Sequence, residues 1–205
     1  MKWVWLIRHG ESTAQAHRRH ENDPSLSPRG EQQARALAAV LGGESFDEAW
    51  ISPLRRTRQT FELSGVRAMR RRLDSRLVEC RFDVDYAAMQ PYECGRGYDA
   101  EADRHDAWCL PAGRRAQAVL AELRGCDAER IVLCTHWGFC SLLLSALAGG
   151  PVPEELHKGA IAFCAPLANA AFAVLALGHP KFGDCVYLWN EHRHVAHLLD
   201  GPLNW

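Results

Sequence analysis

Apolar residues occur in short runs along the chain, and several of these runs stop abruptly at polar residues. Runs of about five residues are typical of buried strands, whereas apolar residues at every third or fourth position indicate a helix. The apolar runs therefore predict a protein rich in buried strands. We expect strands over Trp3–Ile7, Asp47–Ile51, Ile131–Thr135, Ala170–Leu177 and Cys185–Trp189.

Helical spacing of apolar residues appears between these strands. Ser27 and Pro28 suit the N-cap and the first position of a helix, and Ser52 with Pro53 repeats this signal. Two more helices are expected, one over residues 113–124 and one that follows His136-Trp137-Gly138. The buried stripe expected for the first helix consists of Ala34, Leu37, Ala38 and Leu41.

Three segments lack a clear period. Thr13–Ser25 is polar and is interpreted as a loop over the end of the first strand. Residues 80–112 are the least regular part and are interpreted as an inserted cap. The run Arg70–Arg72 is interpreted as solvated surface rather than as a binding patch.

Polar side chains come directly after three of the predicted strands. Arg8 and His9 follow the first strand, an arginine-rich helix start follows the second, and His136 follows the third. In open α/β sheets, ligands bind at the carboxyl ends of the strands. We therefore expect these side chains to converge on one cleft, with one of Arg55, Arg56 and Arg58 facing into it.

The residue types at these strand ends suit phosphate chemistry. Arg8 offers two parallel N–H donors to phosphate oxygens, and helix N-termini attract anions. His9 has a neutral fraction at neutral pH and can act as a nucleophile. Glu79 follows an apolar pair and is a candidate general acid, while Gln15 lies where its amide could contact a phosphate oxygen or simply face solvent.

Composition narrows the functional classes. The chain has 205 residues and a net charge of −1, which fits one large domain over 1–205 and favours neither nucleic acid nor an acidic membrane as partner. No apolar run is long enough to span a bilayer, and no secretory leader is recognised, so we expect a cytoplasmic protein. In that compartment all eight cysteines are expected to be free thiols, with Cys134, Cys140 and Cys164 in the core.

A histidine-rich stretch near the C-terminus invites a metal site. His192, His194 and His197 lie within six residues, but no carboxylate motif accompanies them. A strand edge is the better interpretation, and no metal site is predicted.

Several motifs together resemble the histidine phosphatase superfamily, which is phosphoglycerate mutase-like. They occur in order along nearly the whole chain, and they would be weak signals one by one. They are Arg8-His9-Gly10-Glu11-Ser12, Ser52-Pro53-Leu54-x-Arg56-Thr57-x-Gln59-Thr60, Leu77-x-Glu79 and Thr135-His136-Trp137-Gly138.

The resemblance implies a fold and a set of roles. The fold would be an α/β three-layer αβα sandwich around a mostly parallel sheet. His9 would be the nucleophile that becomes phosphohistidine, and Glu79 the proton donor. Arg8, Arg56 and a cationic His136 would clamp the phosphate, and no metal or other cofactor is implied. Gln15 stands where the family usually has Asn, and Trp137 is a further candidate for substrate binding.

Departures from the family pattern bear on the reaction. Cys80-Arg81-Phe82-Asp83 replaces the stretch typical of mutases, which favours hydrolysis. Ala112-Gly113-Arg114-Arg115 stands where the family usually has Gly-Gly-Glu-Ser. We expect a metal-independent phosphomonoesterase that acts on a phosphorylated small molecule in the cytoplasm.

Other functions remain open on the sequence. A phosphoprotein phosphatase would need an open cleft, and a phosphoglycerate mutase-type phosphotransferase would return the phosphoryl group to a second acceptor. A phosphate-binding scaffold with weak catalysis is the alternative from outside the enzymes. A homodimer is also left open.

Overall fold

The computed structural model describes residues 1–19, 21, 23–80, 110–150, 152 and 165–199. The predicted cap over residues 80–112 falls mainly outside these ranges, as does Cys164.

One six-stranded sheet organises the described residues, with strand order β3-β2-β4-β1-β5-β6. The first four strands in this order pair in parallel, and β5 pairs antiparallel with both of its neighbours. The predicted mostly parallel sheet is confirmed. The strands are β1 (Lys2–Arg8), β2 (Ser45–Ile51), β3 (Arg67–Leu73), β4 (Arg130–Thr135), β5 (Phe172–His179) and β6 (Gly183–Glu191).

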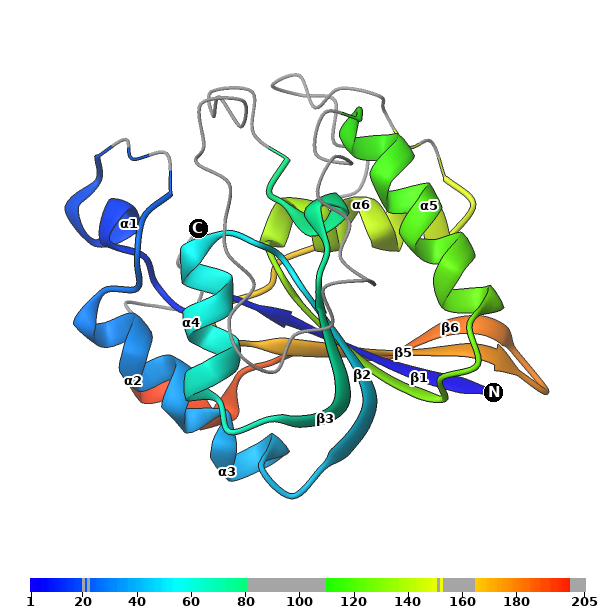
Figure 1. Ribbon diagram of the computed structural model, residues 1–205, viewed down its shortest axis with the longest axis horizontal. Coiled ribbons are helices and arrows are strands. Elements are labelled where there is room, and N and C mark those ends of the chain that lie inside the picture. The colour runs from blue at the N-terminus through cyan, green and yellow to red at the C-terminus, as the bar shows by residue number, and fades with distance from the viewer. Residues whose placement is uncertain (20, 22, 81–109, 151, 153–164, 200–205) are drawn as a thin grey trace.

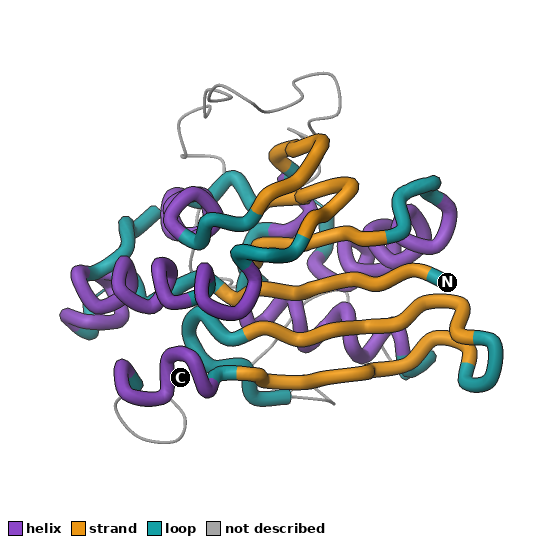
Figure 2. Tube along the Cα trace, turned by 90° about the horizontal axis from the view of Figure 1, so that it is seen from below, coloured by secondary structure: helices purple, strands orange, loops and turns teal. Residues whose placement is uncertain are grey.

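Helices cover both faces of this sheet, which gives the three layers (Figures 1 and 2). Helices α2 (Pro28–Ala36), α3 (Ala38–Leu41) and α4 (Arg55–Leu63) lie on one face, and α5 (Ala112–Gly125) and α6 (Trp137–Leu147) lie on the other. The shorter elements are α1 (Thr13–His17) and the 3₁₀ helices η1 (Ser75–Leu77) and η4 (Arg193–Leu198). In the described part of the chain, no helix has both the length and the apolar character needed to cross a bilayer.

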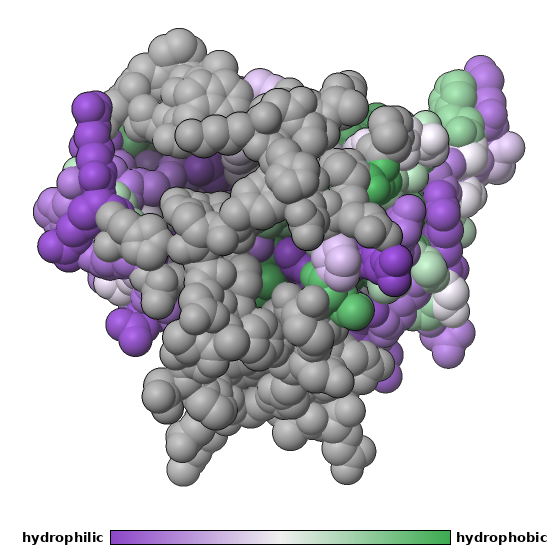
Figure 3. All heavy atoms as spheres, turned by 90° about the horizontal axis from the view of Figure 1, so that it is seen from above, coloured by the Kyte–Doolittle hydropathy of each residue, from purple (hydrophilic) through white to green (hydrophobic). Residues whose placement is uncertain are grey.

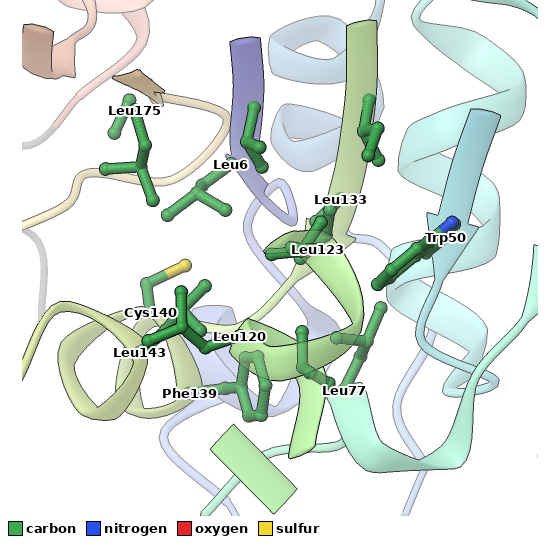
Figure 4. Packing of buried hydrophobic residues seen from close by; sticks show 14 of the residues in the cluster. Leu6, Trp50, Leu77, Leu120, Leu123, Leu133, Phe139, Cys140, Leu143 and Leu175 are labelled. Carbon is green, nitrogen blue, oxygen red and sulfur yellow. The ribbon is translucent and has the colours of Figure 1, made fainter. Parts of the chain in front are cut away.

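Alternation along the strands divides the core into two layers. Leu6, Trp50 and Leu133 point from the sheet toward α5 and α6, where Leu120, Leu123, Phe139 and Leu143 meet them (Figure 4). Ile7, Ile51 and Cys134 point to the opposite face and pack with Leu37, Leu41 and Phe61. Because successive residues of a strand face opposite ways, each apolar run supplies both layers.

The predicted start of the first helix is confirmed. The prediction of one continuous helix is wrong, because the segment forms two helices, α2 and α3. Ser27 caps α2, since its side-chain oxygen accepts a bond from the Gly30 N–H at 3.0 Å, and Pro28 is the first helical residue. At Leu37 the backbone N–H bonds to Ala34 O, a tighter turn that separates α2 from α3. This change of twist leaves Ala38 exposed, although it was expected in the buried stripe.

The structure also differs from the sequence interpretation at the basic run 70–72, which belongs to edge strand β3. Arg72 is only 7% exposed, and its guanidinium lies 3.8 Å above the Trp50 ring. It pairs with Asp74 and Glu122, and Arg76 pairs with the same two carboxylates. Solvated surface is therefore the wrong interpretation for Arg72, although Arg70 is exposed as expected.

Asp74 is the fully buried member of this ion-pair cluster. We expect Asp74→Ala to lower the free energy of unfolding by about 3 kcal/mol or more, because Arg72 and Arg76 would lose a buried partner. Urea denaturation measures this loss. Glu31→Ala is the matched control, since its pair with Arg35 is exposed and such pairs are worth about 0.5 kcal/mol or less. Equal losses for the two variants would contradict a buried structural role for Asp74.

The tail strands are confirmed, with β5 starting two residues later than expected. The three nearby histidines follow β6, at and within 3₁₀ helix η4, so their placement on a strand edge is wrong. His194 Nε2 lies 3.0 Å from Ala170 O. Among the described residues, no group of three or more His, Cys, Asp or Glu side chains could hold a metal ion.

The described cysteines at 80, 126, 134, 140 and 185 carry free thiols. Cys134 and Cys140 are fully buried, as predicted.

Candidate active site

The carboxyl ends of β1, β2 and β4 meet at one place because the strands are parallel neighbours in register. Arg8 pairs with Thr135 across β1 and β4, and Ile51 pairs with Cys134 across β2 and β4. The next residues, His9, Ser52 and His136, are consequently brought together. The predicted convergence of the strand ends is observed.

Arg56 connects the two histidines. Its Nε donates to His9 Nε2 and its Nη2 to His136 Nδ1, each at 3.2 Å. Arg56 is buried in the first turn of α4, whereas Arg55 is exposed. Of the three arginines at this junction, Arg56 is thus the one that binds both histidines.

The start of α4 differs from the predicted Ser-Pro cap. The N-cap residue is Leu54, and the Asp23 carboxylate accepts the Arg55 N–H at 2.8 Å. Ser52 instead places its Oγ 2.9 Å from His136 Nε2. A serine that local sequence assigns to a helix cap therefore orients a histidine that lies 84 residues further along the chain.

This network assigns the protons on both imidazoles. Because a guanidinium only donates, His9 Nε2 and His136 Nδ1 are acceptors. The proton of His9 therefore lies on Nδ1, which is 2.7 Å from Gly10 O, and that of His136 lies on Nε2. His9 Nε2 keeps its lone pair, and nucleophilic attack requires that lone pair.

Burial and nearby cations keep both imidazoles neutral. Burial is the largest cause that lowers the pKa of His9 and of His136 well below the ordinary value, and the Arg56 charge is the next. Burial also lowers the pKa of Arg8, to about 10, which leaves it charged at neutral pH. The expected cationic His136 is not the favoured state of this site, so the positive charge here comes from Arg8 and Arg56.

These low pKa values predict a pH dependence of stability. In the unfolded chain, histidines take up a proton near pH 6.5, whereas folded His9 and His136 stay neutral to lower pH. The unfolded state then binds more protons, so the free energy of unfolding decreases as the pH falls below about 6.5. The slope is up to about 1.4 kcal/mol per pH unit for each histidine.

Urea unfolding between about pH 7.5 and pH 5 measures this slope, above the range in which ordinary carboxylates titrate. The double variant His9→Ala, His136→Ala is expected to show a shallower slope. A slope unchanged by the double substitution would mean that these imidazoles are not the groups responsible.

Residues 165–171 bind the backbone of Arg8 and His9 and the side chain of Arg8, and hold them in place. Leu167 O accepts a bond from Arg8 Nη1 at 2.5 Å, and Ala171 O accepts the Arg8 N–H. The Asn169 side chain donates to His9 O at 3.1 Å. The sequence interpretation missed Asn169, which is buried; its only signal in the sequence is a polar residue directly before a predicted strand.

Glu79 lies against the start of α6. A Cβ added to Gly138 would lie 2.5 Å from Glu79 Oε1, so this glycine leaves the space that the carboxyl group occupies. The Cys80 N–H donates to the same oxygen at 2.9 Å. The Glu79 charge partly offsets the lowering of the Arg8 pKa, so the carboxylate is close enough to interact electrostatically with the guanidinium.

Two further predicted contact residues use their polar atoms within the protein. Gln15 closes a capping box on α1: its Oε1 accepts the Ser12 N–H, and its amide lies 3.4 Å from Asn169. Trp137 donates its indole N–H to Ala165 O at 2.9 Å. Contact of either side chain with a substrate stays a prediction. The segment 13–25, expected to be a loop, contains helix α1.

Figure 3 shows one face of the molecule, on which the visible described residues are mostly hydrophilic with a few hydrophobic side chains among them. The fold and the site define a class: an α/β protein with two arginines and two neutral histidines buried at the strand ends. A sequence model of the histidine phosphatase superfamily (branch 1) matches residues 4–165, and the chain belongs to this superfamily. The membership confirms the predicted family and enzyme class.

Relatives by sequence include proteins named as phosphatases. The adenosylcobalamin/alpha-ribazole phosphatase of Escherichia coli (strain K12) is 27% identical over 172 residues, 75% of this chain and 83% of that protein. Human 6-phosphofructo-2-kinase/fructose-2,6-bisphosphatase 4 is 40% identical over 65 residues. That match covers 31% of this chain and only 14% of the human protein.

Solved structures share the fold. An Escherichia coli structure described as an alpha-ribazole-5'-P phosphatase superposes with a TM-score of 0.68 at 22% identity, over 94% of this chain and 98% of the other. A mycobacterial glucosyl-3-phosphoglycerate phosphatase in complex with VO3 gives 0.63 at 24% identity, over 93% and 99%.

Proposed function

We propose that the protein is a metal-independent phosphomonoesterase that hydrolyses a phosphorylated small molecule in the cytoplasm through a phosphohistidine on His9. One observation carries the proposal. His9 Nε2 carries no proton, and its lone pair accepts the Nε–H of the Arg56 guanidinium, which can hold the phosphate, at 3.2 Å; the Nδ1–H bond to Gly10 O fixes the ring.

The first step transfers the phosphoryl group to the enzyme. His9 Nε2 attacks phosphorus and the P–O bond to the leaving group breaks, while Arg8 and Arg56 balance the charge on the equatorial oxygens. The Glu79 carboxyl group gives the leaving alkoxide a proton, and Glu79 takes up a proton again from water in the second step. The His136 Nε2–H donates a hydrogen bond to Ser52 Oγ and takes no part in the proton transfer. This hydrogen bond keeps His136 Nδ1 directed at Arg56.

The second step returns the enzyme to its starting state. The Glu79 carboxylate takes a proton from water, the water oxygen attacks phosphorus, and the P–N bond to His9 breaks. Inorganic phosphate leaves. No metal is needed in either step, because Arg8 and Arg56 supply the positive charge that a metal would otherwise provide.

The choice of a small-molecule substrate is supported by the relatives, whose names include alpha-ribazole and fructose-2,6-bisphosphate phosphatases. Release of phosphate from p-nitrophenyl phosphate, with a chelator present throughout, tests the reaction class. Hydrolysis at an undiminished rate is expected, and loss of activity on chelation would contradict the proposal.

A panel of a phosphoserine peptide and small phosphorylated sugars and nucleosides then tests the substrate class. A higher kcat/KM for a small phosphomonoester is expected. Preference for the peptide would favour a phosphoprotein phosphatase, and transfer of the phosphoryl group to a second phosphoglycerate would favour a mutase.

A further inference from the structure

Arg115 is a buried arginine whose bonds go to the protein backbone. It is only 3% exposed and lies near the start of α5. Its Nη1 donates to Arg76 O and to Val78 O, both at 2.8 Å. Both carbonyls belong to the segment that leads directly to Glu79.

The same guanidinium reaches both sides of the undescribed segment 81–109. Its Nη2 lies 3.5 Å from Glu79 O and 3.8 Å from Cys80 Sγ, and its Nε donates to Leu110 O at 3.2 Å. Burial raises the pKa of the Cys80 thiol to about 12, so this sulfur is neutral and forms no ion pair with Arg115. One planar group therefore fixes the backbone before Glu79 relative to the start of α5.

Helix α5 holds this segment at a second point. Glu122, seven residues after Arg115 and on the same face of the helix, pairs with Arg72 and Arg76. The Arg72–Asp74–Arg76 cluster fixes the path of η1, and Arg115 fixes the residues that follow it. The ion-pair cluster alone would hold η1 but would not fix the backbone of Val78 and Glu79, which Arg115 contacts.

A buried charge is costly unless it is well bonded, and the Arg115 bonds described above go to backbone carbonyls and one neutral thiol rather than to a carboxylate, which suggests a specific role for this side chain. Arg115 also stands where the family pattern has serine, whose short side chain could not reach three carbonyls of one segment. We propose that Arg115 is a positioning residue that holds the Glu79 carboxyl group at the leaving-group oxygen of the substrate. The inference rests on the proposed function and adds a residue to its acid step.

The test uses the leaving-group dependence of Arg115→Met and Arg115→Lys. An alkoxide needs a proton far more than a phenolate does, so misplacing Glu79 affects alkyl phosphates most. For Arg115→Met we expect kcat/KM on an alkyl phosphate to fall about 10- to 100-fold, with kcat/KM on p-nitrophenyl phosphate changing about 3-fold or less. The ratio kcat/KM reports the step that breaks the P–O bond, so it does not include the second step, which is the same for both substrates. Arg115→Lys should recover part of the loss, and Arg114→Met, an exposed neighbour, should lose nothing.

A double-mutant cycle separates positioning of Glu79 from a general structural effect. In the Glu79→Gln background, adding Arg115→Met should cost no further activity on the alkyl phosphate, since the acid is already lost. Thermal unfolding and the affinity for vanadate show how much folded, phosphate-binding enzyme each variant retains. If Arg115→Met does not fold, Arg115→Lys must still lose more on alkyl than on aryl phosphates.

Equal losses of kcat/KM on both leaving groups, or a full additional loss in the Glu79→Gln background, would overturn the role of Arg115 while leaving the proposed function intact. Failure of the proposed function looks different, because the native chain would then not hydrolyse p-nitrophenyl phosphate or would do so without His9.

Discussion

Replacing His9 with alanine is expected to lower kcat for p-nitrophenyl phosphate about 10⁴-fold or more, because the group that attacks phosphorus would be missing. The loss should appear in kcat rather than in phosphate affinity, since Arg8 and Arg56 remain. His9 is buried, and removing it also removes an acceptor of Arg56, so thermal unfolding is measured alongside.

His179→Ala is the matched control. This histidine lies at the β5–β6 turn, where its Nδ1 accepts the N–H groups of Lys181 and Phe182, and its loss should leave kcat unchanged. Activity retained in His9→Ala with a folded chain would mean that another group attacks phosphorus.

Replacing Arg56 with alanine is expected to lower kcat/KM about 10³-fold, within the range seen when one cation or donor at a transition state is removed. Arg56 has two tasks here: it is a candidate phosphate ligand, and it donates to both His9 Nε2 and His136 Nδ1. Arg55→Ala, an exposed neighbour on the same helix turn, should keep nearly full activity.

The Arg56 variants also separate charge from geometry. The Arg56 charge lowers the pKa of His9, second only to burial, so its removal should raise that pKa. Because neutral His9 is the reactive form, the acidic limb of the pH–rate profile should move to higher pH in Arg56→Ala. Arg56→Lys keeps the charge and loses the two-nitrogen contact, so its limb should stay near the native position while kcat remains low. An unshifted limb in Arg56→Ala would show that this guanidinium does not control the state of His9.

The elements that local pattern specifies were predictable. Strands β1, β2 and β4 are apolar runs ended by polar residues, and the start of α2 carries its own Ser-Pro signal. Arg8, His9 and His136 follow from those strand ends alone. The parallel order of the strands then brings them together.

The features missed depend on contacts between distant parts of the chain. Strand β3 looks polar in the sequence, and its Arg72 is buried through contacts with Trp50, Asp74 and Glu122. Ser52 has a local use as a helix cap and a distant one on His136, and the structure contains the second. Arg115 likewise has no sequence signal, since its partners lie 36 to 39 residues earlier and are backbone carbonyls.

Trapping the phosphorylated enzyme tests the central claim most directly. Labelled p-nitrophenyl phosphate, whose leaving group needs little protonation, is mixed with Glu79→Gln, whose slower second step favours accumulation of the phosphorylated enzyme. The reaction is stopped in alkali, where a P–N bond survives. The label should be lost in acid and should map to the peptide that contains His9. A stable ester of serine or threonine, label on another histidine, or turnover with no labelled protein at any time would contradict the account.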